Sequence, residues 1–342
     1  MLAPSPTTGP EAATVPDVLR VEGLTVAFGH GPQAVTALEG VSFALRRGET
    51  LALVGESGSG KSLTALSIMG LLPPGAQVTG GRVTLGTEEL LGRTRAALAD
   101  MRGRRIAMVF QEPMTSLNPV LTVGRQLTEG LQVHRGLGRA EADARAIELL
   151  RIVGLTTPER RLRQYPHQLS GGMRQRVMIA MALACEPDLI IADEPTTALD
   201  VSIQAQIIDL LRDIRDRLGT AVLLITHDLG VVAEMADRIA VLYAGHVVEV
   251  AEAAALFDTP RHPYTEGLLA AVPRLDRLLG ETPDRARLAE LPGSVPSLGE
   301  RPPGCPFVPR CPLALARCGA EMPPMRSVGP EQSAACWVRA PA

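Results

Sequence analysis

Residues 55–62 read Gly55-Glu-Ser-Gly-Ser-Gly-Lys61-Ser62 and fit the pattern G-x-x-x-x-G-K-[ST] of a phosphate-binding loop. The loop follows a short apolar run at residues 49–54, which predicts a buried strand, and the residues from Lys61 onward have helical spacing. Backbone amides of such a loop converge on phosphate groups, and the helix N-terminus adds partial positive charge. The residues expected to surround the phosphates are Gly55, Glu56, Ser57, Gly58, Ser59, Gly60, Lys61, Ser62 and Leu63.

Lys61 is the only lysine of the chain, and the other 33 of its 34 basic residues are arginines. Lysine carries a compact ammonium on a thin stem, whereas arginine carries a broad planar guanidinium. A narrow loop folded round a phosphate has room for the first and not the second. We therefore expect Lys61 to reach the β- and γ-phosphates, with the Ser62 hydroxyl on Mg²⁺.

Composition limits the class of protein. The 342 residues suggest about two domains, and the net charge of −3 argues against a general nucleic-acid binder. No apolar run approaches the roughly 20 residues that cross a bilayer. Residues 1–17 are rich in Pro, Thr and Ala and lack the features of a signal peptide, which predicts a disordered N-terminal tail on a cytosolic chain. Any membrane role would then come through partner subunits.

Short buried strands alternate with helices along residues 18–250, which predicts an α/β fold with a parallel sheet. Residues 123–153 read as helical, because apolar positions recur at three and four residues. After about residue 251 prolines recur and cysteines appear. We expect a core domain at residues 18–250 and a C-terminal extension at residues 251–342.

Polar residues at the ends of two buried strands supply the second half of the expected site. Asp193 and Glu194 follow the run at residues 189–192, and His227 follows the run at residues 221–225. Asp193 is expected to hold Mg²⁺ at one remove, and Glu194 to orient or deprotonate the attacking water. His227 would point toward the γ-phosphate.

Further motifs, in order, resemble those of ABC-transporter ATPases over residues 19 to about 250. The stretch Leu169-Ser-Gly-Gly-Met-Arg-Gln175 resembles the signature loop of that family. The resemblance implies an ABC-type core with a parallel or mixed sheet and a helical subdomain inserted at about residues 112–185. It also implies that Gln111 joins Ser62 and Asp193 at Mg²⁺ and acts in catalysis beside Glu194 and His227.

The same resemblance implies that each ATP is bound by residues of two subunits. Phe28 occupies the position where the family stacks an aromatic ring on adenine. A head-to-tail dimer is implied, in which the signature and D-loop residues of one subunit serve the ATP bound by the other. These residues are Ser170, Gly171, Gly172 and Asp200.

A narrower resemblance concerns residues 111–119 (QEPMTSLNP) and 259–265 (TPRHPYT), which look like those of bacterial oligopeptide and dipeptide importers, with nickel importers close behind. It implies a peripheral ATPase on the cytoplasmic face of the cell membrane. Its partners would be two transmembrane permease subunits, a second ATPase subunit (identical or paralogous) and an extracytoplasmic substrate-binding protein. The alternatives are an importer for nickel or another small solute, and a soluble ABC ATPase acting on ribosomes or DNA.

Four cysteines crowd into the last 38 residues, at Cys305, Cys311, Cys318 and Cys336. Four thiols in a Pro-rich segment with little core of its own suggest a bound metal. The spacing lacks the tight C-x₂-C pair common in zinc sites, which favours iron–sulfur over zinc. With residues 292–298 (PGSVPSL), this tail resembles importer ATPases that carry a [4Fe–4S] cluster. Zinc and unligated thiols remain as alternatives.

Overall fold

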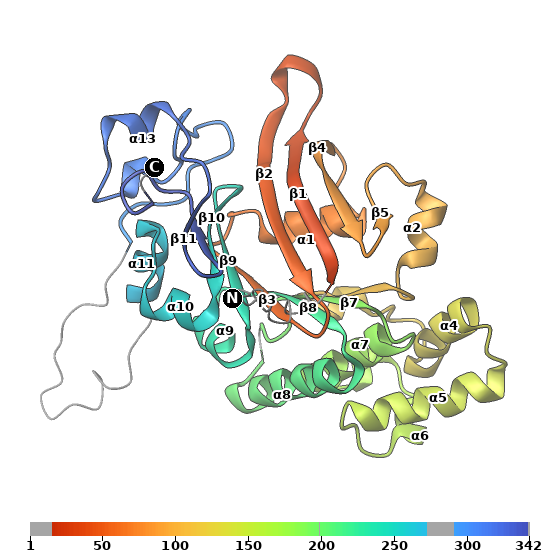
Figure 1. Cartoon of the computed structure of the whole chain (residues 1–342). Coiled ribbons are helices and arrows are strands. Elements are labelled where there is room, and N and C mark those ends of the chain that lie inside the picture. Colours follow the sequence, from red (N-terminus) through yellow and green to blue (C-terminus); the bar gives the residue numbers. More distant parts are fainter. Residues whose placement is uncertain (1–15, 198, 272–290, 341–342) are drawn as a thin grey trace, which may run out of the picture.

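The computed structural model describes residues 16–197, 199–271 and 291–340, and consists of two sheets with helices around them (Figure 1). Most of the expected N-terminal tail, residues 1–15, lies outside the described residues. None of the helices in these ranges is long and apolar enough to span a membrane.

The larger sheet carries the functional strands. Its order is β11-β12-β10-β9-β3-β8-β7-β6, and the neighbours from β9 to β6 pair in parallel, whereas β10, β12 and β11 are antiparallel. The α/β fold with a mixed sheet is thus confirmed. The strand bounds are β3 Thr50–Val54, β6 Ile106–Val109, β7 Leu189–Asp193, β8 Ala221–Ile225, β9 Arg238–Tyr243, β10 His246–Glu252, β11 Arg326–Gly329 and β12 Gln332–Ala334.

The smaller sheet is antiparallel, with the order β2-β1-β4-β5. It covers α1, which lies between the two sheets and contributes Ala65 and Ile68 to the core that they share (Figure 1). The bounds are β1 Asp17–Phe28, β2 Val35–Arg46, β4 Ala76–Leu85, β5 Glu88–Glu89 and α1 Lys61–Met69.

Helices from the middle of the chain cover the opposite face of the larger sheet. Alternate residues of β7 divide between the two faces: Ile190 packs with these helices, and Ile191 packs with α1. This alternation follows from the pleat of a strand buried on both sides. The helices after α1 are α2 Arg95–Met101, α3 Pro113–Ser116, α4 Val123–Arg135, α5 Arg139–Ile152, α6 Pro158–Arg161, α7 Gly171–Leu183, α8 Val201–Leu218 and α9 Leu229–Met235.

The helical prediction for residues 123–153 is confirmed, and the structure divides the stretch into two helices. Helix α4 ends at Arg135, and α5 starts at Arg139 and runs antiparallel to it. Gly136 stands after α4 with φ of 67°, a left-handed conformation that ends a helix and that glycine adopts without strain. The apolar periodicity continues on both sides of this turn and hides it.

The C-terminal extension is built onto the core. Strand β12 pairs with β10, through Glu249 with Ala334 and Val250 with Ser333, so the larger sheet continues across residue 250. Phe307 of the extension is fully buried against Tyr243 of β9 and Tyr264. The remaining helices are α10 Ala253–Asp258, α11 Pro263–Ala270 and α13 Ala316–Ala320, with short 3₁₀ turns at Gly31–Gln33, Pro166–Gln168 and Val308–Arg310.

Candidate functional site

The glycine-rich loop joins β3 to α1. At two of its positions the backbone conformation and the close neighbours leave room only for glycine. Gly55 has φ of 154°, and a Cβ there would lie 2.1 Å from the carbonyl oxygen of Leu242. Gly60 has φ of 107°, and its Cβ would lie 2.5 Å from a methyl carbon of Leu38. The loop is therefore wedged between β9 and β2, and its curvature is fixed before any ligand arrives.

Lys61 lies inside this curve. Its side chain is almost fully buried, and Nζ donates to the carbonyl oxygens of Gly55 at 2.7 Å and Glu56 at 3.0 Å. Burial lowers the pKa of Lys61, and the carboxylates of Glu194, Asp193 and Glu56 oppose this shift. The ammonium has three N–H donors, so two hold the loop and one remains for an anion.

Ser62 and Asp193 lie together, as a magnesium site between them requires. The Ser62 hydroxyl donates to Oδ1 of Asp193 at 3.1 Å, and Asp193 ends the fully buried strand β7. Burial raises the pKa of Asp193, although the hydrogen bond from Ser62 lowers it in part. A hydroxyl and a carboxylate are oxygen ligands of the kind that Mg²⁺ prefers.

Glu194 is held by three side chains. Gln111 donates to its Oε2 at 2.9 Å, Thr197 donates to the same oxygen at 2.8 Å, and Nδ1 of His227 lies 3.1 Å from Oε1. These contacts fix the position of the carboxylate. The backbone of Glu194 is left-handed, with φ of 46°. Strain of this kind in a non-glycine residue is characteristic of functional sites.

The surroundings of Glu194 keep its carboxylate ionised. Burial raises the pKa of its carboxyl, but the hydrogen bonds of Thr197 and His227 and the charge of Lys61 lower it by more, so the net shift is downward. The pKa of the neighbouring Asp193 is shifted in the opposite direction, upward. The carboxylate of Glu194 is therefore ionised at neutral pH and can accept a proton or a hydrogen bond from water.

One cavity of about 760 Å³ unites these groups. Its lining includes Phe28 and the residues Ser57, Gly58, Gly60, Lys61, Ser62, Leu63, Gln111 and Glu194. The cavity is thus lined by half of the residues that the sequence predicts around the nucleotide, and Gly55, Glu56 and Ser59 of the loop are absent from its lining. Asp193 and His227 do not line the cavity themselves. Asp193 is hydrogen-bonded to the lining residue Ser62, and His227 contacts the lining residue Glu194.

The signature residues lie elsewhere. Ser170, Gly171, Gly172 and Asp200 line a second cavity of about 460 Å³, and of the described residues none lines both this cavity and the first. Ser170 caps α7 by accepting a hydrogen bond from the Met173 amide, and Asp200 caps α8. The structure therefore separates these four residues from the phosphate loop of their own chain.

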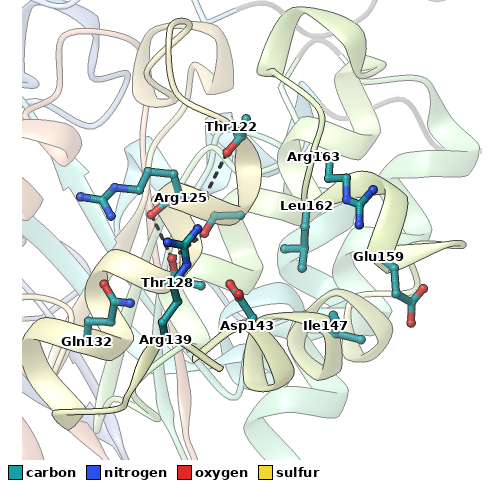
Figure 2. Close-up of a pocket in the computed structure, with 11 residues that line it drawn as sticks. Thr122, Arg125, Thr128, Gln132, Arg139, Asp143, Ile147, Glu159, Leu162 and Arg163 are labelled. Carbon is teal, nitrogen blue, oxygen red and sulfur yellow. Dashed lines mark hydrogen bonds between the residues drawn. The ribbon is translucent and has the colours of Figure 1, made fainter. Parts of the chain in front are cut away.

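A further cavity of about 590 Å³ lies between α4, α5 and α6 (Figure 2). The hydroxyls of Thr122 and Thr128 already have hydrogen-bond partners in α4. Thr122 caps the helix, and the Thr128 hydroxyl donates to the Gly124 carbonyl at 2.8 Å. Of its described lining residues none belongs to the phosphate loop. We assign it no part in nucleotide chemistry.

The four cysteines of the extension meet at one place. Cys305, Cys311, Cys318 and Cys336 all line a small cavity of about 20 Å³ beneath Phe307 and Trp337. Burial, with the nearby charges of the other three thiols, raises the pKa of Cys305 to about 11. Across the described ranges, no group of three or more His, Cys, Asp or Glu side chains is arranged to hold a single metal ion.

Three contacts around the site are not apparent from the sequence patterns. Thr197 holds Glu194, Tyr264 accepts from the Glu56 amide at 2.8 Å, and Arg310 binds the Glu56 carboxylate. Thr197 could have been found, because it lies three residues after Glu194. Arg310 could not, because nothing in the chain links it to a residue 254 positions earlier.

Comparison with protein families gives two matches. Residues 38–197 match the model described as ABC transporter, and residues 248–318 match the model described as oligopeptide/dipeptide transporter, C-terminal region. The first match spans the phosphate loop, the signature and the Asp193–Glu194 pair, and the second enters the cysteine-rich extension.

Curated relatives match over nearly the whole chain. The probable peptide ABC transporter ATP-binding protein y4tR of Sinorhizobium fredii is 54% identical over 94% of both chains. The oligopeptide transport ATP-binding protein AppD of Bacillus subtilis is 49% identical over 94% of this chain and 96% of its own. The dipeptide transport ATP-binding protein DppD of the same organism is 49% identical, over 94% and 95%.

Among solved structures, a dimeric bacterial ABC transporter cassette, MJ0796, is 33% identical with a TM-score of 0.62, over 69% of this chain and 98% of its own. The same cassette in a dimeric post-hydrolysis state bound to ADP and Pi is 32% identical with the same TM-score.

Proposed function

The chain belongs to the ATP-binding proteins of peptide-type ABC transporters, and from this premise we propose that it hydrolyses ATP to drive import of peptides through separate membrane subunits. It is an ABC-type ATPase coupled to transport. The observation that carries the proposal is the constellation around Glu194, whose carboxylate is fixed by Gln111, Thr197 and His227 beside Lys61 and the Ser62–Asp193 pair.

Each residue has a distinct task in this proposal. Lys61 binds the β- and γ-phosphates with its remaining N–H donor, and the loop amides orient them. Ser62, Asp193 and Gln111 would hold Mg²⁺, which neutralises charge on the phosphate oxygens when it is bound. Glu194 orients the attacking water and takes its proton, and His227 keeps that carboxylate in place. Phe28 binds the base.

We propose peptides as the solute because the related y4tR, AppD and DppD proteins are named for peptide, oligopeptide and dipeptide transport. An importer for nickel or another small solute is the second candidate, because it would need the same ATP site. Copurification of the complex from membranes, with identification of the bound solute, tests the assignment. Isolation without any permease or binding protein would count against an importer altogether.

The separation of the two cavities supports a head-to-tail dimer. The phosphate loop of one subunit binds its ATP without the signature residues of the same chain. The Ser170 hydroxyl and the amides of Gly171 and Gly172 can therefore bind the phosphates of the ATP held by the other subunit. The dimeric state of the MJ0796 cassette supports the formation of a dimer. The second subunit would be an identical or a paralogous ATPase.

Ser170→Asp tests this assignment in trans. Aspartate caps a helix as well as serine does, so α7 is retained, but its charge repels a phosphate. We expect ATP hydrolysis to fall by about tenfold or more while the monomer binds ATP normally. Steady-state turnover and calorimetric titration measure the two quantities. Ser327→Asp, at an exposed position of β11 that lines neither cavity, is the control. A loss of monomer affinity in Ser170→Asp would contradict the assignment.

The cysteine cavity is the second part of the proposal, and we infer an iron–sulfur cluster there. The donor set fits, because four thiols from one Pro-rich segment surround one space. The described side chains offer no group of three or more His, Cys, Asp or Glu residues ready to hold a metal ion, so binding of a cluster would require the thiols to rearrange. The thiols must turn outward for this, since the present volume of about 20 Å³ holds about one water.

Anaerobically purified protein is expected to be brown and to contain about four iron atoms per chain. Cys311→Ser should remove the iron and the colour, because serine is a poor ligand for iron in these clusters. Metal analysis and visible absorbance make the measurement, and Cys185→Ser is the matched control outside the extension. Colourless protein with stoichiometric zinc would refute the cluster.

A further inference from the structure

Residues 295–298 of the C-terminal extension line the nucleotide cavity. Val295, Pro296, Ser297 and Leu298 share it with Phe28 and the phosphate loop. They belong to the PGSVPSL stretch, to which neither ATP hydrolysis nor the cysteine site assigns a task. The stretch thus brings three apolar side chains to a site that also contains the polar side chains of Lys61, Gln111 and Glu194.

Both ends of this segment are tied to the ATP site. At its start, Arg310 donates to the carbonyl oxygens of Pro292 at 2.8 Å and Leu291 at 3.3 Å, and forms a two-point ion pair with Glu56 of the phosphate loop at 2.6 and 2.9 Å. The Arg310 side chain is only 4% exposed, which makes this pair a fixed link rather than a surface contact.

At its end, Arg301 donates to the carbonyl oxygens of Thr36 at 3.1 Å and Ala37 at 2.9 Å. Thr36 pairs with Ala27 and is therefore next to Phe28 in the sheet. The segment consequently runs from the phosphate loop to the strand end that carries Phe28. A nucleotide bound by its phosphates at the loop would extend along the same direction.

The apolar side chains at this place are left uncovered by the protein. Leu298 is 39% exposed, and Phe28, Val295 and Pro296 are half-buried. Aromatic rings are recognised by apolar surfaces on their faces, and ligand sites commonly pair such surfaces with a few polar groups. A purine base between Phe28 and the segment would cover all four.

We propose that residues 295–298 form, together with Phe28, the base-binding part of the ATP site, so that the C-terminal extension sets nucleotide affinity within its own chain. This inference rests on the proposed ATPase function. Phe28 supplies the aromatic face, and Val295, Pro296 and Leu298 supply the opposing apolar wall. Arg310 and Arg301 are positioning residues that hold this wall.

The double variant Val295→Ala, Leu298→Ala tests the wall in the full-length protein. We compare the affinities for ATP and for inorganic tripolyphosphate, which has the phosphates and no base, by calorimetry. The dissociation constant for ATP is expected to rise about tenfold, since several apolar carbons lose contact with the base. The constant for tripolyphosphate is expected to stay as in the wild type.

Leu315→Ala is the matched control, because Leu315 is an exposed leucine of the same extension outside the nucleotide cavity. Unchanged ATP affinity in the double variant would overturn the proposal, and so would an equal weakening of ATP and tripolyphosphate. Failure of the wild type to bind or hydrolyse ATP would instead refute the proposed function. The two failures are therefore distinguishable.

Discussion

Glu194→Gln is expected to abolish ATP turnover and to leave ATP binding intact. The amide keeps the size of the side chain but cannot accept a proton, and loss of a positioned general base costs about 10²- to 10⁴-fold in rate. Turnover is measured by phosphate release under single-turnover conditions, and binding by calorimetric titration of ATP.

The contacts of Glu194 make this variant structurally mild. Its Oε2 accepts from Gln111 and Thr197, and the amide oxygen of glutamine can take that place. The amide nitrogen would then face Nδ1 of His227, which accepts a hydrogen bond in one tautomer. Glu22→Gln, on the exposed part of β1, controls for the loss of one charge. Retained turnover in Glu194→Gln would remove this residue as the base.

Local sequence patterns predict the catalytic groups because these groups are sequence neighbours of the strands that place them. Asp193 ends β7 and Glu194 follows it, His227 follows β8, and Lys61 opens the helix after β3. A parallel sheet brings the carboxyl ends of neighbouring strands to one edge. The order of motifs along the chain was therefore sufficient to assemble this side of the site.

The base side of the site depends on contacts that no local pattern encodes. Arg310 meets Glu56 and Arg301 meets Ala37 across more than half of the chain. Each arginine resembles the many others of a chain whose basic residues are nearly all arginine. Likewise the pairing of β12 with β10 extends the sheet into a segment that composition alone sets apart.

Lys61→Arg is expected to reduce ATP hydrolysis by about 10²-fold or more, although the positive charge is kept. Nζ of Lys61 donates at 2.7 Å and 3.0 Å to two carbonyls of its own loop, inside a curve that Gly55 and Gly60 hold closed. A guanidinium is broader and planar and cannot make these two bonds and a phosphate contact from one point. Steady-state phosphate release and ATP titration measure the loss.

The exchange isolates shape as the variable. Burial lowers the pKa of Lys61, against the opposing carboxylates, whereas an arginine remains protonated, so any loss in Lys61→Arg arises from geometry and not from a missing charge. Arg125→Lys, the reverse exchange in an exposed turn of α4, shows whether the two residues are interchangeable where space is open. Near-normal hydrolysis by Lys61→Arg would mean that the single lysine of the chain owes its place to chance. A loss confined to Lys61→Arg would mean that the narrow loop selects the ammonium.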